Sequence, residues 1–277
     1  MGWRDRGLEV KSPEQLLLMR RAGLVVGRTL ETLRSHVRAG VTTGELDAIA
    51  EDSIRSAGAT PSFLGYHGFP ASICASVNAE VVHGIPGARA LEDGDLVSID
   101  CGAIVEGWHG DAAFSVVVGD PAAARPEVRT LIDVTEDALW AGIAAARVGG
   151  RVGDISHAVE SHVRSRGRYG ILEDYTGHGI GTAMHLDPDV PNEGRPGRGP
   201  RLVAGLALAV EPMVTLGSAR SVTLDDDWTV VTEDGSWGAH SEHTFVLTEH
   251  GAWVLTALDG GEERLTALGV PFGPLAD

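Results

Sequence analysis

The chain has 277 residues, and its 39 Asp and Glu against 22 Lys and Arg give a formal net charge of −17 with histidine counted as neutral. This charge excludes a nucleic-acid-binding protein that relies on bulk electrostatic attraction. Hydrophobic residues make up 43% and charged residues 22%, which is typical of a folded globular protein and excludes wholesale disorder. No apolar run approaches the roughly 20 residues that span a bilayer, and the first residues lack the apolar stretch of a secretory signal. We therefore expect a cytoplasmic protein that does not associate with membranes.

Capping signals at the start of the chain predict two helices. Ser12 and Gln15 have the spacing of a capping box, and apolar residues then recur at three-, four- and seven-residue steps as far as Gly40. Thr42 and Glu45 repeat the capping pattern and open a second helix. Runs rich in β-forming residues follow at 72–78, 96–105 and 108–118. We expect the last two runs to form a hairpin across a tight turn.

The second half of the chain repeats this order of helices followed by strands. Helices are predicted from Pro126 and from about Asp154, because apolar residues recur on one face of each. Runs rich in β-forming residues then return at 206–216, 228–232 and 242–248. The repeated order indicates two structurally related halves within one fold.

Matching carboxylates strengthen the interpretation as a repeat. Asp100 lies six residues after Gly94, and Glu211 lies six residues after Gly205, each at the end of an apolar strand as predicted. A buried carboxylate is costly unless it is paired or bound to a metal, and here the cost occurs at two matching positions. We infer internal pseudo-twofold symmetry, with the carboxylates of both halves converging between them.

The expected organisation is an N-terminal tail over residues 1–11, a single domain over 12–258 and a C-terminal tail over 259–277. The segment 192–201 is rich in Gly, Pro and Arg, and we expect it to be an exposed loop within the domain.

Five side chains on or beside the predicted strands are candidate metal ligands: Asp100, Asp111, His178, Glu211 and Glu242. The first two flank the hairpin turn, so adjacent strands can present both carboxylates to one point. Oxygen donors with a single nitrogen suit a Mn, Fe, Co or Zn ion better than a thiolate site would. Because four carboxylates are too many for one divalent ion, we expect two ions about 3.5–4 Å apart, bridged by carboxylates and a water. A single Asp at a hairpin end, such as Asp111, is usually a turn residue. The interpretation as a metal site therefore depends on the candidate ligands occurring together.

Other histidines and cysteines lie close to these candidates. His83 and His185 lie outside the ligand cluster, so we expect them to act as hydrogen-bond donors or acid–base groups around a bound amide. His109 and His240 are expected to support the ligands or to be structural. Cys101 follows Asp100 and therefore points to the opposite face of its strand, where we expect a small buried hydrophobe. With only two cysteines in the chain, a disulfide framework and a cysteine-based zinc site are excluded.

Seven segments carry a resemblance to a known family: Gly65-Tyr66-His67-Gly68-Phe69-Pro70, Val82-His83-Gly84-Ile85-Pro86, Ser98-Ile99-Asp100, Gly110-Asp111, Gly177-His178-Gly179-Ile180-Gly181, Val210-Glu211-Pro212-Met213 and Ser241-Glu242-His243-Thr244. Over residues 12–258 the chain resembles the type I methionine aminopeptidases. The first two segments together are specific to this branch of the pita-bread superfamily. The resemblance implies an α/β (α+β) pita-bread catalytic domain, with a central antiparallel sheet flanked by two helix pairs.

The resemblance also implies a reaction, the metal-dependent removal of the N-terminal methionine from nascent proteins and peptides, especially when the second residue is small and uncharged. Two divalent ions, of Co, Mn, Fe or Zn, are implied. In the family pattern Asp100 binds one ion, His178 and Glu211 bind the other, and Asp111 and Glu242 bridge both.

Further roles follow from the same resemblance. Glu211 is the candidate proton shuttle, His185 lies near the developing oxyanion, and His83 lies near the leaving amide nitrogen. An apolar pocket would recognise the methionine side chain by burial and by contacts between sulfur and aromatic rings. By motif position its lining residues are Phe63, Tyr66, Phe69, Cys74, Met184 and Trp228.

The sequence departs from the family pattern at four positions. His240 and Ser241 stand where a glutamine and an aromatic residue commonly precede the Glu-His-Thr motif, and Met184 stands where many bacterial members carry a phenylalanine. Phe63 is larger than the cysteine of some relatives. These changes alter pocket shape and hydrogen bonding, so from the sequence we expect them to affect substrate range and rate rather than metal binding.

Two alternative functions share this fold. An X-prolyl aminopeptidase or dipeptidase has the same ligand set, and a non-catalytic pita-bread binding protein would normally lack some of the five ligands. The expected partners are the N-terminal methionine of nascent polypeptides and the ribosome, without recognition of a nucleic-acid sequence. The resemblance further implies a monomer.

Overall fold

The computed structural model describes residues 7–275, so the terminal-tail expectations for residues 1–6 and 276–277 lie outside the described residues. The helices are α1 (Pro13–His36), α2 (Thr43–Ser56), α3 (Pro126–Ala145), α4 (Val152–Arg166) and α5 (Glu262–Ala267). The strands are β1 (Thr60–Pro61), β2 (Ile73–Val77), β3 (Glu80–Val82), β4 (Leu96–Val105), β5 (Trp108–Val117), β6 (Gly170–Ile171), β7 (Thr176–Gly179), β8 (Leu186–Pro191), β9 (Ala207–Val210), β10 (Met213–Thr215), β11 (Ser221–Thr223), β12 (Val230–Thr232), β13 (Gly238–His240), β14 (Glu242–Thr248) and β15 (Gly251–Val254). Short 3-10 turns cover Tyr66–Gly68 and Pro121–Ala123.

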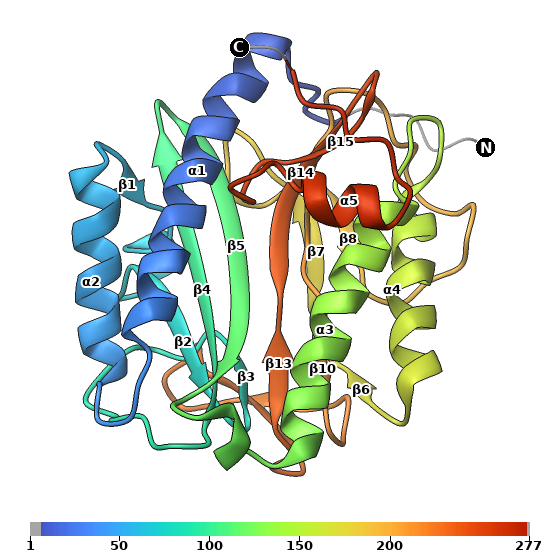
Figure 1. The fold of residues 1–277 in the computed structure, drawn as a ribbon. Helices are drawn as coiled ribbons and strands as arrows, with labels where there is room; N and C mark the ends of the chain where they lie inside the picture. The colour runs from blue at the N-terminus through green and yellow to red at the C-terminus, as the bar shows by residue number, and fades with distance from the viewer. Residues whose placement is uncertain (1–6, 276–277) are drawn as a thin grey trace.

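A nine-stranded antiparallel sheet is the centre of the fold, with strand order β1-β4-β5-β14-β9-β7-β8; β2 pairs with β4, and β15 pairs with β14. Two three-stranded sheets, β13-β10-β6 and β11-β12-β3, complete the strands. In Figure 1 the pair α1 and α2 lies over one half of the large sheet, and the pair α3 and α4 lies over the other. This arrangement confirms the predicted pita-bread class, in which two helix pairs flank an antiparallel sheet.

Both predicted N-terminal capping boxes are present. The Ser12 side chain accepts from the Gln15 backbone N–H, and the Gln15 side chain accepts from the Ser12 N–H at 2.8 Å. Thr42 and Glu45 make the same exchange at the start of α2. The predicted end of the first helix at Gly40 was wrong by a few residues, because the backbone is already extended at Val37.

Each helix pair packs on its half of the sheet through its own apolar core. Residues of α1 and α2 such as Leu33, Leu46 and Ile54 pack with Ile99 and other residues of β4 and β5. Cys101 is fully buried in this core, which confirms its prediction as a small buried hydrophobe. The second core joins α3 and α4 to β9 and β14. The seam between β5 and β14 is therefore where the two halves meet.

The strand predicted over 206–216 is in fact two strands that belong to different sheets. β9 ends at Val210 in the large sheet, and β10 begins at Met213 in a small one. Pro212 has no N–H to donate, so it cannot continue the ladder, and Glu211 occupies the break. Glu211 therefore lies directly after the end of a strand, as predicted, whereas Asp100 lies in the middle of β4 rather than at its end.

The terminal segments that the structure describes contact the domain. Val10 bridges to Leu206, and the Lys11 N–H donates to the Gly205 carbonyl at 2.9 Å. Beyond residue 258, α5 buries Leu265, and Phe272 bridges to Ala252 beside β15. Residues 259–275 therefore pack on the half of the molecule that contains α3 and α4.

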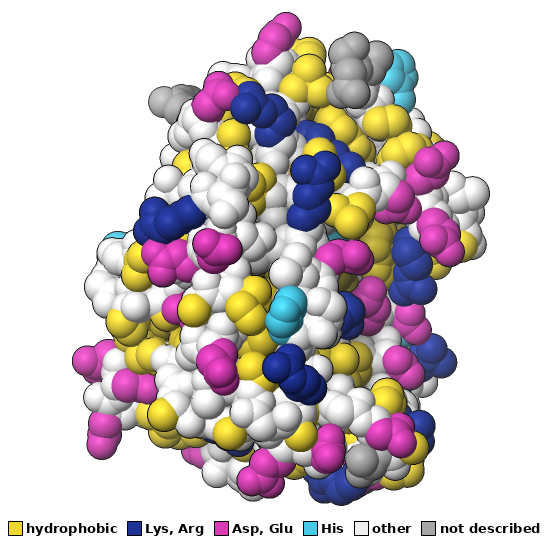
Figure 2. Space-filling model, turned by 60° about the vertical axis from the view of Figure 1, so that its left-hand side comes forward, with side chains coloured by type: hydrophobic (Ala, Val, Ile, Leu, Met, Phe, Trp, Pro, Cys, Tyr) yellow, Lys and Arg dark blue, Asp and Glu magenta, His cyan; other side chains and the backbone are white. Residues whose placement is uncertain are grey.

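The acidic side chains do not gather in one patch on the face that Figure 2 shows. Figure 2 shows one face, on which Asp and Glu side chains lie scattered among Lys and Arg side chains. None of the helices within residues 7–275 is long and apolar enough to cross a membrane.

Candidate metal centre and methionine pocket

Asp100 and Asp111 meet through the register of the β4–β5 hairpin. Asp100 pairs with Ala113 and Gly102 pairs with Asp111, so the two carboxylates are diagonal neighbours on one face of the sheet. They are close enough to share a hydrogen bond. The backbone N–H of Asp111 donates to Thr244 Oγ1 at 3.1 Å, and the Thr244 hydroxyl donates to the Asp111 carbonyl at 2.8 Å. This exchange joins β5 to β14 and fixes Asp111 at the seam.

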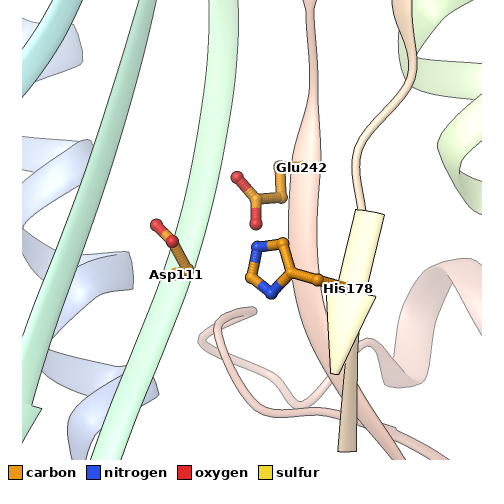
Figure 3. A group of neighbouring side chains, drawn as sticks. All are labelled: Asp111, His178 and Glu242. Carbon is orange, nitrogen blue, oxygen red and sulfur yellow. The ribbon is translucent and has the colours of Figure 1, made fainter. Parts of the chain in front are cut away.

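The other three candidate ligands come from the opposite half. His178 lies on β7, Glu211 follows β9, and Glu242 begins β14. Figure 3 shows Asp111 on one side of the seam and His178 and Glu242 on the other, and one ligand atom from each lies within 4.8 Å of the others. His178 Nε2 lies 3.5 Å from Glu211 Oε1. The five side chains therefore converge between the halves.

Burial strongly disfavours the charged forms of the four carboxyl groups. It raises the pKa of Asp100 from its ordinary 3.8 to about 7. Burial together with neighbouring carboxylates raises the pKa of Asp111, Glu211 and Glu242 well above the usual range. Like charges gathered in a site of low dielectric oppose ionisation, and a bound cation reverses that effect.

The donor set fits divalent metal ions. Asp100 Oδ1, Asp111 Oδ1 and Glu242 Oε1 are buried and have no hydrogen-bond partner among the described residues. His178 Nδ1 lies 2.9 Å from the Gly179 carbonyl oxygen, which can only accept, so Nδ1 carries the proton and Nε2 faces the carboxylates with a free lone pair. Burial lowers the pKa of His178 to about 4, which keeps the imidazole neutral, as a metal ligand must be.

An apolar pocket adjoins the carboxylates. Phe63, Phe69, Cys74 and Met184 are buried in one cluster, with Trp228 packed against it. The Phe69 and Trp228 rings meet edge to face at 5.0 Å. Together with the carboxylate cluster they line a cavity of about 130 Å³. The residues that line it are Phe63, Tyr66, Phe69, Cys74, His83, Asp100, Asp111, His178, Met184, His185, Glu211, Trp228 and Glu242. Every site residue that the sequence predicted is thus brought to one cavity.

His83 and His185 border the same cavity. The His185 Nδ1 atom lies 2.7 Å from the Tyr66 hydroxyl, and the His185 ring lies 4.3 Å from the ring of His178. His83 has a positive φ of 58°, a conformation that is strained for a histidine and is often kept at functional sites. Burial lowers the pKa of His83 to about 4, so its ring is a neutral donor or acceptor.

The profile of metallopeptidase family M24 matches residues 17–249. The chain belongs to metallopeptidase family M24. Methionine aminopeptidase 1 of Mycobacterium tuberculosis is 53% identical over 252 residues, which cover 89% of this chain and 94% of the relative. Methionine aminopeptidase 1 of Bacillus subtilis is 48% identical over 246 residues, covering 89% and 98%. Within the M24 family, the chain therefore belongs with the methionine aminopeptidases, and it uses divalent metal.

Solved structures of the M24 fold agree. A methionine aminopeptidase from Rickettsia prowazekii superposes with a TM-score of 0.87 at 39% identity, covering 90% of this chain and 99% of that one. A prolidase from Pyrococcus furiosus superposes with a TM-score of 0.71 at 21% identity and is covered over only 65% of its length. The second likeness shows the shared fold alone, so the X-prolyl alternative has less support.

Two residues around this M24 site were missed or misjudged in the sequence, and a third lies where the sequence expected a supporting or structural residue. Ile85 packs against the apolar cluster, and its position two residues after His83 was the available signal. Asn192 was placed in an exposed loop but is buried, and its side-chain amide donates to the Glu211 carbonyl at 3.1 Å. His240, which the sequence analysis expected to support the ligands or to be structural, is buried beside the glutamates.

Proposed function

We propose that this protein removes N-terminal methionine from peptides and nascent proteins by hydrolysis at a centre of two divalent ions. The observation that supports this most directly is the single cavity in which an apolar pocket meets four carboxylates and His178. Exopeptidase action on methionine needs these features side by side, one to bind the side chain and one to act on the first peptide bond.

The five candidate ligands would hold the ions. In the proposed assignment Asp100 binds one ion, His178 and Glu211 bind the other, and Asp111 and Glu242 bridge both. Two ions balance the charge of four carboxylates, which burial otherwise leaves unfavourable. When bound, such ions supply Lewis-acid polarisation of the peptide carbonyl and activation of water.

Protein side chains would handle the protons and the substrate amide. Glu211, whose pKa burial raises, is suited to accept a proton from the attacking water and to return it to the leaving nitrogen. His185, oriented by its contact with the Tyr66 hydroxyl, would stabilise the charge that develops on the carbonyl oxygen. His83 would hydrogen-bond the substrate amide on the side of the leaving nitrogen.

The pocket supports methionine as the preferred first residue. A flexible thioether gains free energy from burial against Phe63, Phe69 and Trp228 and from contacts with their rings. We propose that a small uncharged second residue is preferred, as the family resemblance implies. Nascent chains as substrates would place the activity in the cytoplasm near the ribosome, with the enzyme acting as a monomer.

The deciding experiment compares hydrolysis of Met-Gly-Met-Met with that of Leu-Gly-Met-Met, using metal-stripped protein titrated with Mn, Co, Fe or Zn. We expect release of methionine only when metal is added, and little release of leucine. Hydrolysis of Gly-Pro in the same assay would favour the X-prolyl alternative. Absence of metal uptake would favour the non-catalytic binding protein.

A further inference from the structure

His240 is a buried histidine for which the five-ligand centre gives no role. It is the last residue of β13, only 2% of it is exposed, and its Nε2 atom has no hydrogen-bond partner among the described residues. An unpartnered nitrogen of this kind is costly in a protein interior, so it indicates a partner that forms in the working state.

The backbone holds His240 rigidly. Its N–H donates to the Ser115 hydroxyl at 2.9 Å, and that hydroxyl donates to the His240 carbonyl at 2.8 Å. In addition, β13 pairs with β10, placing His240 opposite Met213. The imidazole is therefore carried on a frame fixed from both the β5 side and the β10 side.

The imidazole points at the two glutamates of the centre. His240 Nε2 lies 3.6 Å from Glu211 Oε2 and 4.0 Å from Glu242 Oε2. Meanwhile the other oxygen of Glu211, Oε1, lies 3.5 Å from His178 Nε2. Glu211 thus turns one carboxylate oxygen toward the ligand side of the cavity and the other toward His240.

We propose that His240 is a positioning residue that donates a hydrogen bond from Nε2 to Glu211 Oε2 and so orients this carboxylate for the metal centre. The proposal rests on the dinuclear centre of the proposed function. The candidate cluster that contains His240 includes Glu211 and Glu242 but neither His178 nor Asp111, which places His240 on the outer side of the glutamates. Ligating carboxylates are commonly held by such outer partners.

The test measures metal binding rather than turnover. His240→Leu has similar volume and no donor, whereas His240→Gln keeps an N–H at similar reach. Isothermal titration of the metal-stripped proteins with Mn and Co should show an affinity about 10- to 100-fold weaker for His240→Leu, the range for lost outer partners. His240→Gln should restore most of that loss. His157→Leu is the control, since His157 is exposed on α4 and its Nε2 contacts the Ser161 hydroxyl at 3.4 Å rather than a glutamate.

Two results would overturn the proposal. One is wild-type affinity in a folded His240→Leu protein, which would leave the dinuclear centre standing and remove only the role of His240. The other comes from X-ray absorption of Co-loaded protein, where one imidazole fewer in His240→Gln than in wild type would make His240 a direct ligand. If wild-type protein bound no divalent ion, the proposed function would fall, and the role of His240 with it.

Discussion

The two ends of the cavity differ in what they contribute to the folded protein. At the apolar end Phe63, Phe69 and Met184 are buried against one another, as in any hydrophobic core. At the opposite end one carboxylate oxygen of Asp100 and one of Asp111 are buried without a partner among residues 7–275. Burial therefore stabilises the protein at the apolar end and destabilises it at the carboxylate end, which indicates that the carboxylates are kept for function.

Among the substitutions that test the difference between the two ends, Asp111→Ala should cause the largest loss of activity. Removing the bridging carboxylate should lower turnover of Met-Gly-Met-Met by more than about 100-fold, beyond the losses caused by changing outer partners of metal ligands. The fold should persist, because the backbone exchange between Asp111 and Thr244 does not use the side chain. Circular dichroism and assays at saturating metal would check both points, with the exposed Asp52→Ala as control. Wild-type turnover in Asp111→Ala would refute the dinuclear assignment.

Trp228→Ala probes the apolar end. The substitution removes part of the surface that contacts the methionine side chain, so kcat/KM for Met-Gly-Met-Met should fall by about 10- to 100-fold. That factor corresponds to the free energy of burying one large apolar side chain. Metal affinity should not change, because Trp228 is not among the candidate ligands. Trp237→Ala removes a partly buried tryptophan that packs on the distant core and should leave the preference for methionine over leucine intact. Weakened metal binding in Trp228→Ala would mean that the two ends are not independent.

The fold could be predicted largely from local signals. Capping boxes fixed the starts of α1 and α2, and the hairpin register that brings Asp100 to Asp111 follows from a tight turn. The break between β9 and β10 was missed because an apolar run of this length matches one continuous strand, and only Pro212 signals the interruption. Tertiary pairing decided which sheet each piece joined, and no local pattern encodes that.

The site could be predicted because motif residues and charge arguments chose the same positions. Supporting contacts were harder, since Asn192 reaches Glu211 from a segment that is near it only in the folded protein. His240 could be expected near the site only because it lies close to Glu242 in the sequence. Composition predicted an exposed loop over residues 192–201. The first residue of that segment, Asn192, is nevertheless buried, and its side-chain amide donates to the Glu211 backbone carbonyl. Outer partners of this kind leave no spacing pattern in a sequence.

The pH dependence of metal binding follows from the carboxylate end. In the metal-free protein the pKa of Asp100 is raised from 3.8 to about 7, so the folded state holds its proton more tightly than the unfolded chain does. Stability from this group is present below pH 3.8 and is lost as pH rises through about 7. Metal must displace the proton, so affinity should fall as pH drops below 7, by up to about tenfold per pH unit for each proton released. Titration calorimetry in buffers of different ionisation enthalpy would count the protons. A pH-independent affinity would contradict the raised pKa.

Glu242→Gln should give the smallest effect and the clearest separation of stability from function. Glu242 is buried, and both burial and neighbouring carboxylates raise its pKa. Replacing it by a neutral amide should stabilise the metal-free protein at pH 8 by about 1–3 kcal/mol, because it removes a carboxyl whose raised pKa disfavours the folded state at a pH above its unfolded pKa. With Mn or Co added, the order should reverse, since wild type alone keeps the full ligand set and gains stability from binding. Thermal melts with chelator and with metal would measure both, and Glu249→Gln, at an exposed residue directly after β14, should change neither. A chelated Glu242→Gln protein less stable than wild type would mean that Glu242 stabilises the fold even without metal, and the contrast between the two ends would fail.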